Sequence, residues 1–548
     1  MKLYDSRTTL PKKLAIFLTS RELHWSIIFV GIVLRLIQYL LNRSLWIDES
    51  FIALNIINKP FSELLQPLDY NQAAPVGFLI LEKLVVQIFG GSEYALRLVP
   101  FLSGIISIFL FYRLAIWFSK PQAVTIALGL FAISDRLIYY SSEVKQYSSD
   151  VAIALLVFLA VINIKSKKLT TPRVVFFGII GAISVWFSHP SIFILAGTGI
   201  SLILFDIRKK EKLKFIKYLI VCSFWLLSFT IFYFISLRSL TNNEYLLNSW
   251  SNNHNAFMPF PPFSSTGIRW FADTFFEVFN NPVGIHLSGI AALTFIIGCV
   301  SKFADEKKKF YFLISPLIVA LFASGLEKYP FEGQLLLFIV PFVLILVAEG
   351  TCYFITQTWH NSSIIGITLI LLLFFHPLQS AVLNLKNPQN SAHPFQRVRE
   401  EIKPVLSYVR ENRRNGDVIY LYYASQYAFK YYLERYGLNY EDRKQAVWAI
   451  SPKTWFAPAL PSYPPYFIVG KYSRDNWKEF VSELNGLYGN KRVWLIFSHV
   501  HDRRSDIDEE DMFLHHLNTI GKQLDYFKST EASAYLYDLS KEPKTEEQ

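Results

Sequence analysis

The chain has 548 residues, 52% of them hydrophobic and 16% aromatic, and its formal net charge is +11. Long apolar blocks recur from Trp25 to Leu383. Many of them reach the roughly 18 residues that a helix needs to cross the bilayer core, which excludes a soluble protein. The excess positive charge lies between these blocks and not in the tail, so it does not indicate a nucleic-acid partner. The three cysteines form neither a CxxC pair nor a metal-type cluster, so disulfide and zinc sites are not expected.

The basic N-terminus leads into the first apolar block without a small-residue cleavage site, which indicates a retained signal anchor. Apolar blocks predict about eleven membrane-spanning helices. In chain order they are expected at 25–42, 95–117, 121–140, 149–164, 173–187, 190–206, 213–236, 284–301, 310–326, 333–357 and 362–383. Residues 1–383 are therefore expected to form a transmembrane domain.

Lysine and arginine set the expected orientation, because cytoplasmic loops carry an excess of both. They gather in alternate connections, at 113–120, 165–173, 208–217 and 302–309. This alternation predicts a cytoplasmic N-terminus and an extracytoplasmic tail in a multi-pass protein of the cell (inner) membrane. The segments expected outside are 43–94, 141–148, 188–190, 237–283, 327–332 and the tail. In the first of them, Val76–Phe89 is too short and too charged to span, and we expect an amphipathic helix in the interface.

The tail, 384–548, alternates strand-like and helix-like segments, which predicts a separate soluble α/β domain. Buried strands are expected at 417–423, 466–469 and 492–500, with helices at 397–412, 424–436, 474–487 and 508–521. No Gly-rich phosphate loop follows a strand, and His501-Asp502 at a strand end is interpreted as a turn. A lid over a site or an acceptor-binding module fits such a tail.

Two adjacent carboxylates, Asp48 and Glu49, stand directly after the first expected span. At a membrane surface the lowered dielectric and the like charge oppose joint ionisation of the pair. Such a pair commonly serves as a general base or as a cation ligand. The structural alternative, an interfacial tryptophan followed by a helix N-cap, fits the spacing equally well.

Further polar residues lie in or beside the segments expected outside. Lys145 and Tyr147 are residue types that hold a phosphate, although a solvated loop is the favoured interpretation of their segment. His189 alone is more often a satisfied interfacial group than a ligand. The other candidates are weak singly and share one expected membrane face: Asp69, Gln72, Arg97, Glu143, Lys328 and Tyr329. No His/Asp ligand spacing stands out, so no metal site is assigned, and the sequence leaves a divalent cation open as a cofactor.

The order of these pieces resembles the C-type-fold (GT-C) glycosyltransferases that use polyprenyl- or dolichyl-phosphate sugars. It is most similar to the branch with the protein O-mannosyltransferases and the aminoarabinose transferases of lipid A. The matching pieces are the Asp-Glu pair, D-x-x-Q-x-x-P from Asp69, SEYALRLVP from Ser92, EVKQY from Glu143 and YPFxGxLLLFxxP from Tyr329. The ordered set, and not any single motif, carries the resemblance, which covers residues 25–383.

Three positions depart from the family pattern. Ala74-Pro75 stands where Pro-Pro is expected, and Lys145-Gln146 stands where Arg-Pro is expected. Gln334 stands near the place of an expected arginine. Lysine keeps the charge at its position but lacks the bidentate fork of arginine, whereas glutamine loses the charge. Both changes bear on how a donor phosphate would be held, and they leave a divergent donor open.

The resemblance implies inverting transfer of a sugar from a polyprenyl-phosphate carrier to a lipid, glycan or protein acceptor on the extracytoplasmic face. Asp48 would act as the general base, and Glu49 would orient the acceptor or share a cation. Lys145, with Tyr147 and either Arg97 or Lys328, would stabilise charge on the departing phosphate.

Three other functions are compatible with a multi-span protein. A transporter or flippase should carry charges deep in several spans or broken helices in matching halves, and Arg35 and Glu349 are its candidates. A lipid-linked glycan ligase or polymerase should place its key residues in a long, late outer loop. A scaffold with a sensor tail would not need the acidic pair.

Overall fold

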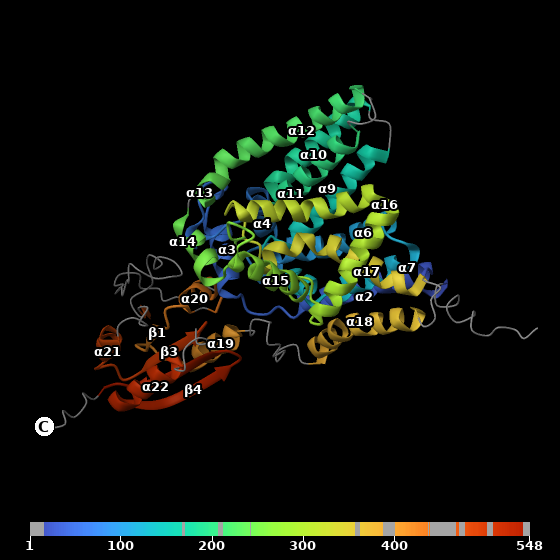
Figure 1. Ribbon diagram of the computed structural model, residues 1–548. Helices are drawn as coiled ribbons and strands as arrows, with labels where there is room; N and C mark the ends of the chain where they lie inside the picture. Colours follow the sequence, from blue (N-terminus) through green and yellow to red (C-terminus); the bar gives the residue numbers. More distant parts are fainter. Residues whose placement is uncertain are drawn as a thin grey trace, which may run out of the picture. The chain divides into compact units, whose positions relative to one another are not determined.

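A computed structural model of the protein describes residues 16–166, 170–206, 212–241, 243–356, 362–386, 400–433, 435–436, 438, 467–470, 477–500 and 508–540. The chain forms two compact units (Figure 1). The transmembrane unit comprises Met1–Leu41, Lys59–Pro67 and Ala73–Lys386. The α/β unit comprises Asn42–Asn58, Leu68–Gln72 and Asn387–Gln548, so part of the first expected outer segment belongs to the same unit as the tail.

Apolar helices make up the transmembrane unit. Within the described residues, six of them are long and apolar enough to cross a membrane: α2 (Arg21–Leu40), α6 (Leu98–Phe118), α12 (Lys212–Phe232), α16 (Ser288–Gly325), α17 (Val340–Thr356) and α18 (Ser362–Lys386). Shorter apolar helices accompany them: α7 (Pro121–Ile133), α9 (Tyr147–Ser166), α10 (Thr171–Phe187) and α11 (Ser191–Asp206). α16 has 38 residues and breaks at Glu306 (φ −143°, ψ 64°), so it supplies two of the expected spans. The multi-span helical class is confirmed, although the span expected at 121–140 breaks at Ser134 into α7 and α8 (Asp135–Tyr140).

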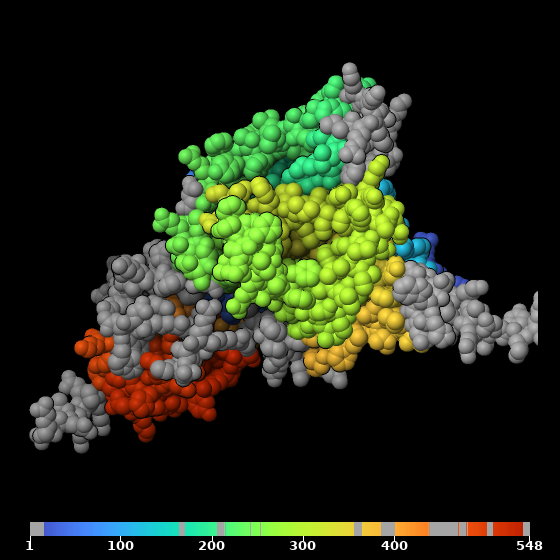
Figure 2. Space-filling model, in the orientation of Figure 1, coloured from blue at the N-terminus to red at the C-terminus, as the bar shows by residue number. Residues whose placement is uncertain are grey.

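Helix α17 forms the centre of this unit. Side chains from Leu336 through Ala348 are almost completely buried, and α17 packs against α7, α16 and α18. A Cβ atom on Gly298 of α16 would overlap the carbonyl of Leu346, and one on Gly350 would overlap the carbonyl of Thr294. Small residues let transmembrane helices approach closely where there is no water to drive apolar burial. On the face shown in Figure 2, α12 and α16 lie at the surface, and their exposed apolar side chains suit contact with lipid tails.

Short helices connect the spans. Before α6 they are η2 (Glu63–Leu65), α4 (Val76–Phe89) and α5 (Glu93–Leu96). Between α12 and α16 they are η5 (Tyr233–Leu237), α13 (Arg238–Thr241), α14 (Glu244–Asn248), η6 (Ser249–Asn253) and α15 (Ser265–Asn280), and η7 (Gly333–Ile339) leads into α17. The helix expected at Val76–Phe89 is confirmed as α4, which buries one face and exposes Leu84, Ile88 and Phe89 on another.

The α/β unit contains, within its described residues, one sheet in the order β2-β1-β3-β5-β4. The strands β1 (Val418–Leu421), β2 (Phe467–Val469) and β3 (Val493–Ser498) are parallel and match the three expected strands. The antiparallel hairpin of β4 (Lys522–Ser529) and β5 (Ala532–Asp538) was not expected. The helices of the tail are α19 (Ile402–Asn412), α20 (Gln426–Tyr432), α21 (Trp477–Asn485) and α22 (Glu509–Ile520). The expected turn at His501-Asp502 lies outside the described residues.

Two segments from the beginning of the chain complete this unit. They are α3 (Ile47–Asn58) and η3 (Asp69–Asn71). α3 packs against α20, and the ring of Phe51 meets that of Tyr427 edge to face with 4.6 Å between centroids. Tyr70 stacks on Phe51 at 5.3 Å. An aromatic cluster therefore joins the two early segments to the tail.

Candidate functional site

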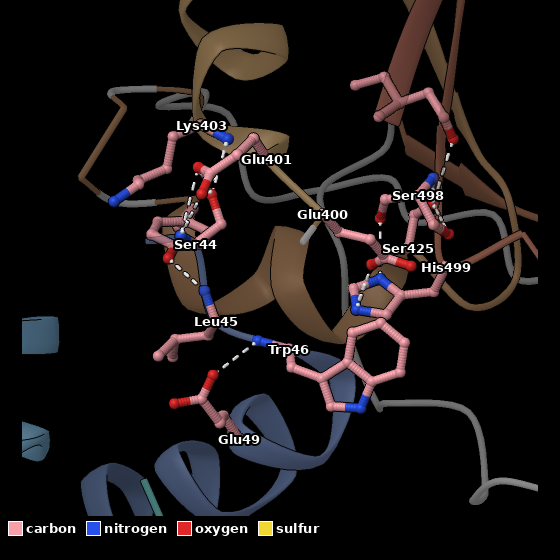
Figure 3. Close-up of polar contacts among 12 residues, drawn as sticks. Ser44, Leu45, Trp46, Glu49, Glu400, Glu401, Lys403, Ser425, Ser498 and His499 are labelled. Carbon is pink, nitrogen blue, oxygen red and sulfur yellow. Dashed lines mark hydrogen bonds and ion pairs between the residues drawn. The ribbon is translucent and has the colours of Figure 1, made fainter. Parts of the chain in front are cut away.

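Glu49 of the acidic pair acts as a cap for helix α3. Its Oε2 accepts a hydrogen bond from the backbone N–H of Trp46 at 3.0 Å (Figure 3). Its Oε1 lies 3.7 Å from Nη2 of Arg43, and both side chains are buried. The reach of a glutamate at the third helical position back to the residue before the helix is one half of a capping box. One Glu49 oxygen therefore caps the first turn of α3, and the other lies next to Arg43.

Asp48 is the more exposed member of the pair. It occupies the second position of α3 and is half-buried, whereas Glu49 is fully buried. Successive helical residues point about 100° apart, so the two carboxylates do not share a direction. A partly accessible carboxylate is what a general base requires.

The stretch from Asp69 to Gln72 is held by Asn55 of α3. Asn55 Nδ2 donates to the carbonyl of Asp69 at 3.2 Å, and Asn55 Oδ1 accepts from the N–H of Asp69 at 3.0 Å. Gln72 Nε2 donates to the carbonyl of Tyr70 at 3.1 Å, so the Gln72 amide supports its own turn. Asp69 is exposed, and its charge partly offsets the burial that lowers the pKa of Lys430.

The segment from Glu143 to Tyr147 is buried in the transmembrane unit between α8 and α9. Glu143 is 3% exposed and Lys145 6% exposed, so the solvated loop favoured from the sequence is wrong. The Lys145 N–H donates to the Glu143 carbonyl at 2.7 Å, which tightens the turn. Gln146 Nε2 donates to the carbonyl of Ala73 at 3.4 Å. A buried lysine beside a buried glutamate is the kind of group that usually has a specific use.

Tyr147 links this segment to η7. The rings of Tyr140 and Tyr147 meet edge to face with 5.2 Å between centroids. The Tyr140 hydroxyl donates to Gln334 Oε1 at 3.5 Å, and η7 packs against α9. Gln334, which departs from the family pattern, therefore contacts the same tyrosine, Tyr140, as Tyr147 does. We call the buried polar residues around Tyr147 the polar corner.

A carboxylate that the sequence did not single out, Asp150, completes this corner. It lies one turn after Tyr147, with Ser188 as a polar neighbour. Its Oδ1 is buried and has no hydrogen-bond partner within the described residues. Asp150 and Tyr147 add to the burial that raises the pKa of Tyr329, so all three side chains share one electrostatic environment. We call Tyr147, Asp150, Ser188 and Tyr329 the Asp150 cluster. The signal that could have found Asp150 is a carboxylate in the first turn of an apolar helix.

His189 lies beside the Asp150 cluster and is uncharged at neutral pH. It stands between α10 and α11, and burial lowers its pKa from 6.5 to about 4. Its Nε2 is buried without a hydrogen-bond partner in the described part of the chain. A neutral imidazole can accept or donate one hydrogen bond to a ligand, but it adds no positive charge for a phosphate.

The remaining cations differ in burial. Arg97 is 1% exposed at the junction of α5 and α6. Lys328 is exposed to solvent, although its neighbour Tyr329 donates to the carbonyl of Leu335 at 2.7 Å inside the unit. Arg35 in α2 donates to the carbonyls of Gly31 and Ala132, each at 3.0 Å, and serves helix packing.

Metal ligation finds no support in the described ranges. Within them, no group of three or more His, Cys, Asp or Glu side chains is arranged to hold a metal ion.

Comparisons with known proteins rest on structure. No protein-family model and no curated protein matches the sequence. ArnT from Cupriavidus metallidurans bound to undecaprenyl phosphate is similar with a TM-score of 0.51 and 10% identity, covering 93% of this chain and 97% of ArnT. The apo state of the same protein has a TM-score of 0.50 at 11% identity and covers 95% of this chain and 99% of its own. An oligosaccharyltransferase from Archaeoglobus fulgidus reaches a TM-score of 0.44 at 12% identity, covering 93% of this chain and 72% of that one.

The similarity to ArnT extends over both units of the chain, and it agrees with the helices and sheet described above. The expectation of a multi-span helical fold with a C-terminal α/β domain is confirmed. At 10% identity the likeness concerns the fold and not the activity. The chain is an integral membrane protein with the C-type (GT-C) glycosyltransferase fold.

Proposed function

We propose that the protein is a membrane glycosyltransferase that moves a sugar from a polyprenyl-phosphate carrier to an acceptor on the extracytoplasmic face. The observation that carries the proposal is the buried polar corner of Lys145 and the Asp150 cluster within an apolar helical unit. Support also comes from the fold, which is that of a protein whose structure contains undecaprenyl phosphate. Polar groups buried among transmembrane helices are costly and commonly mark a substrate site.

The donor phosphate is assigned to Lys145 and to the hydroxyl of Tyr147, two residues later in the chain. A cation in a region poor in water stabilises developing negative charge by several kcal/mol. Arg97 is buried and is the better second cation, whereas the exposed Lys328 would act in water and contribute less. Glu143, His189 and the Asp150 cluster offer hydrogen-bonding groups of the kind that hold sugar hydroxyls.

Asp48 is the proposed general base for the acceptor. Asp48 would take the proton of the acceptor hydroxyl as that oxygen attacks the anomeric carbon. The bond between the anomeric carbon and the phosphate oxygen breaks, and the carrier phosphate leaves with the electron pair. Because the acceptor attacks from the face opposite the phosphate, the configuration at the anomeric carbon inverts. Asp69 and Gln72 are the other candidates for acceptor contact. Glu49 keeps a supporting role, because its carboxylate already caps α3 and pairs with Arg43.

The transporter alternative loses its two candidate residues. Arg35 donates to the backbone carbonyls of Gly31 and Ala132. Glu349 Oε1 accepts from the N–H of Lys120 at 2.7 Å and lies 3.7 Å from Nζ of Lys302. Both charges therefore join helices to one another. Intramembrane charges on a transport path would instead face a cavity.

The test is a profile of lipid-linked sugars in cells with and without the gene. A transferase consumes one carrier-linked sugar, so its loss should enlarge the pool of a single polyprenyl-phosphate sugar. Returning the gene should bring that pool back to its wild-type size. An unchanged profile would contradict the proposal. Accumulation of a longer lipid-linked glycan would instead favour a ligase or polymerase.

Variants then test the assigned residues. We expect Asp48→Asn and Lys145→Ala, at wild-type abundance in the membrane, to leave the sugar pool enlarged. Asp273→Asn, which changes a carboxylate that is 73% exposed on α15, is the matched control and should return the pool to its wild-type size. If Asp48→Asn returned the sugar pool to its wild-type size, the assignment of Asp48 as general base would be wrong.

A further inference from the structure

Three consecutive residues that lead into α3 are each bound by a different element of the tail. Ser44 is bound at the start of α19, where its N–H lies 3.3 Å from both carboxylate oxygens of Glu401 and its Oγ donates to Oε2 at 2.8 Å. The N–H of Leu45 donates to the Tyr432 hydroxyl of α20 at 3.0 Å. The indole of Trp46 packs on the ring of His499, after β3, with 5.0 Å between ring centroids.

Two adjacent glutamates supply the central part of this arrangement. Glu400 and Glu401 point in opposite directions, the first to His499 and the second to Ser44 (Figure 3). The N–H of Glu401 donates to the carbonyl of Thr530 in the turn between β4 and β5 at 2.9 Å. The sheet therefore holds the backbone from which both carboxylates extend.

His499 is itself fixed at the end of β3. Its Nε2 lies 2.6 Å from Oε2 of Glu400, and both side chains are buried. Its Nδ1 lies 3.1 Å from Oγ of Ser498, whose N–H donates to Ser425 Oγ at 2.7 Å. His499 has a φ of +58°, in the left-handed region, where asparagine, aspartate and histidine are the most frequent residues after glycine. A buried contact between an imidazole and a carboxylate stabilises a fold poorly by itself, so it indicates a specific task.

The segment that is held contains the carboxylates singled out above. Lys403 binds the carbonyl of Asn42 through its ammonium group, and its N–H lies 3.3 Å from Ser44 Oγ. After Trp46 the helix begins, Glu49 closes its first turn, and Asp48 lies between them. Asp48 therefore lies two residues after Trp46, the last of the residues 44–46 that the tail contacts.

We propose that the α/β unit positions the catalytic base: Glu401, Glu400 and His499 hold residues 44–46 and thereby fix Asp48 for proton abstraction. This inference rests on the proposed function for the role of Asp48. Glu401, Glu400 and His499 are positioning residues and contact neither donor nor acceptor. The tail is then a part of the catalytic machinery and not a separate acceptor-binding module.

The experiment measures backbone hydrogen exchange in the purified full-length protein. Ser44→Ala removes the hydroxyl that Glu401 binds and leaves every tail residue unchanged, and Glu401→Ala removes the carboxylate. We expect both variants to raise exchange at 45–52 by about tenfold or more, with β1, β3 and β5 unchanged. Glu411→Gln, which changes a 65% exposed carboxylate on α19, should exchange like the wild type.

The same variants are compared in cells through the pool of the accumulated polyprenyl-phosphate sugar. We expect Ser44→Ala and Glu401→Ala to enlarge the pool at normal protein abundance. Ser44→Thr keeps the hydroxyl and should give a pool of wild-type size. Wild-type exchange at 45–52 in Ser44→Ala would overturn the proposal. A second result would also overturn the proposal. In it, Ser44→Ala raises exchange in α3 but leaves the sugar pool at its wild-type size, although Asp48→Asn enlarges that pool.

Failure of the proposed function has a different signature. Suppose that Asp48→Asn gives a sugar pool of wild-type size while Ser44→Ala raises exchange at 45–52. Asp48 is then not the general base, although the tail still holds residues 44–46. Asp48→Asn should change exchange at 45–52 less than Ser44→Ala does, because the contacts that hold 44–46 come from Glu401, Tyr432 and His499.

Discussion

At the scale of single residues, neighbouring carboxylates carry different duties. Glu49 is engaged on both oxygens, whereas Asp48 is half-buried in the first helical turn. The sequence alone could not divide the two roles, because a capping box and an acid/base pair have the same spacing. The difference comes from Arg43, whose guanidinium lies within reach of one carboxylate in the folded chain.

Glu49→Ala is therefore expected to act on stability. It leaves the guanidinium of Arg43 buried without its carboxylate partner and removes the cap on Trp46, and loss of one member of a buried pair costs about 3 kcal/mol. Thermal unfolding of the purified protein should show a lower Tm for Glu49→Ala than for Asp48→Asn. Equal melting of both variants would contradict the division of roles.

His189 makes stability depend on pH. Burial lowers its pKa from 6.5 to about 4, so the unfolded chain binds a proton more readily than the folded protein. Stability from this residue is complete above pH 6.5 and falls as the pH drops from there to about 4, by about 3 kcal/mol in total.

The measurement compares Tm at pH 7.5 and pH 5.0 for the wild type and for His189→Phe. We expect the wild type to lose more stability on acidification, because phenylalanine does not titrate. An identical fall in Tm for both proteins would show that other groups control the acid response.

At the scale of elements, the sequence predicts well what depends on local pattern. The apolar blocks correspond to apolar helices, and the charged stretch at 302–309 contains Glu306, where α16 breaks between two of the expected spans. The hairpin β4–β5 was missed because β4 alternates exposed and half-buried residues and reads as a polar segment. The place of α3 beside α20 was missed because it depends on contacts between residues far apart in the chain.

The close approach of α16 and α17 depends on two glycines. Gly350→Ala should destabilise the transmembrane unit, because its Cβ would overlap the carbonyl of Thr294 on the facing helix. Gly289→Ala, also in α16, places a Cβ where nothing lies within 4 Å and is the matched control. We expect Gly350→Ala to give less monodisperse protein on size-exclusion chromatography after detergent extraction, and Gly289→Ala to behave like the wild type. Normal extraction of Gly350→Ala would mean that α16 can move aside.

At the scale of the whole molecule, polar contacts in the transmembrane unit gather at two ends of its helices. At one end, Lys120 lies 3.0 Å from Asp305 beside the break in α16, and Lys302 lies 3.7 Å from Glu349. The Asp150 cluster contains Tyr329, which follows the other end of the second half of α16. The basic connections and the proposed phosphate site are therefore separated by the length of a helix, as alternation of lysine and arginine requires.

This separation predicts an orientation that labelling can test. In a background without Cys222, Cys299 and Cys352, a membrane-impermeant maleimide should label Asp273→Cys in intact cells. Lys307→Cys should react only after permeabilisation, because positively charged connections stay in the cytoplasm. Both positions are exposed, so access to the reagent and not burial decides the outcome. The reverse pattern would place the Asp150 cluster at the cytoplasmic face. A carrier-linked sugar displayed outside could then not reach Lys145, and transfer on the extracytoplasmic side would be ruled out.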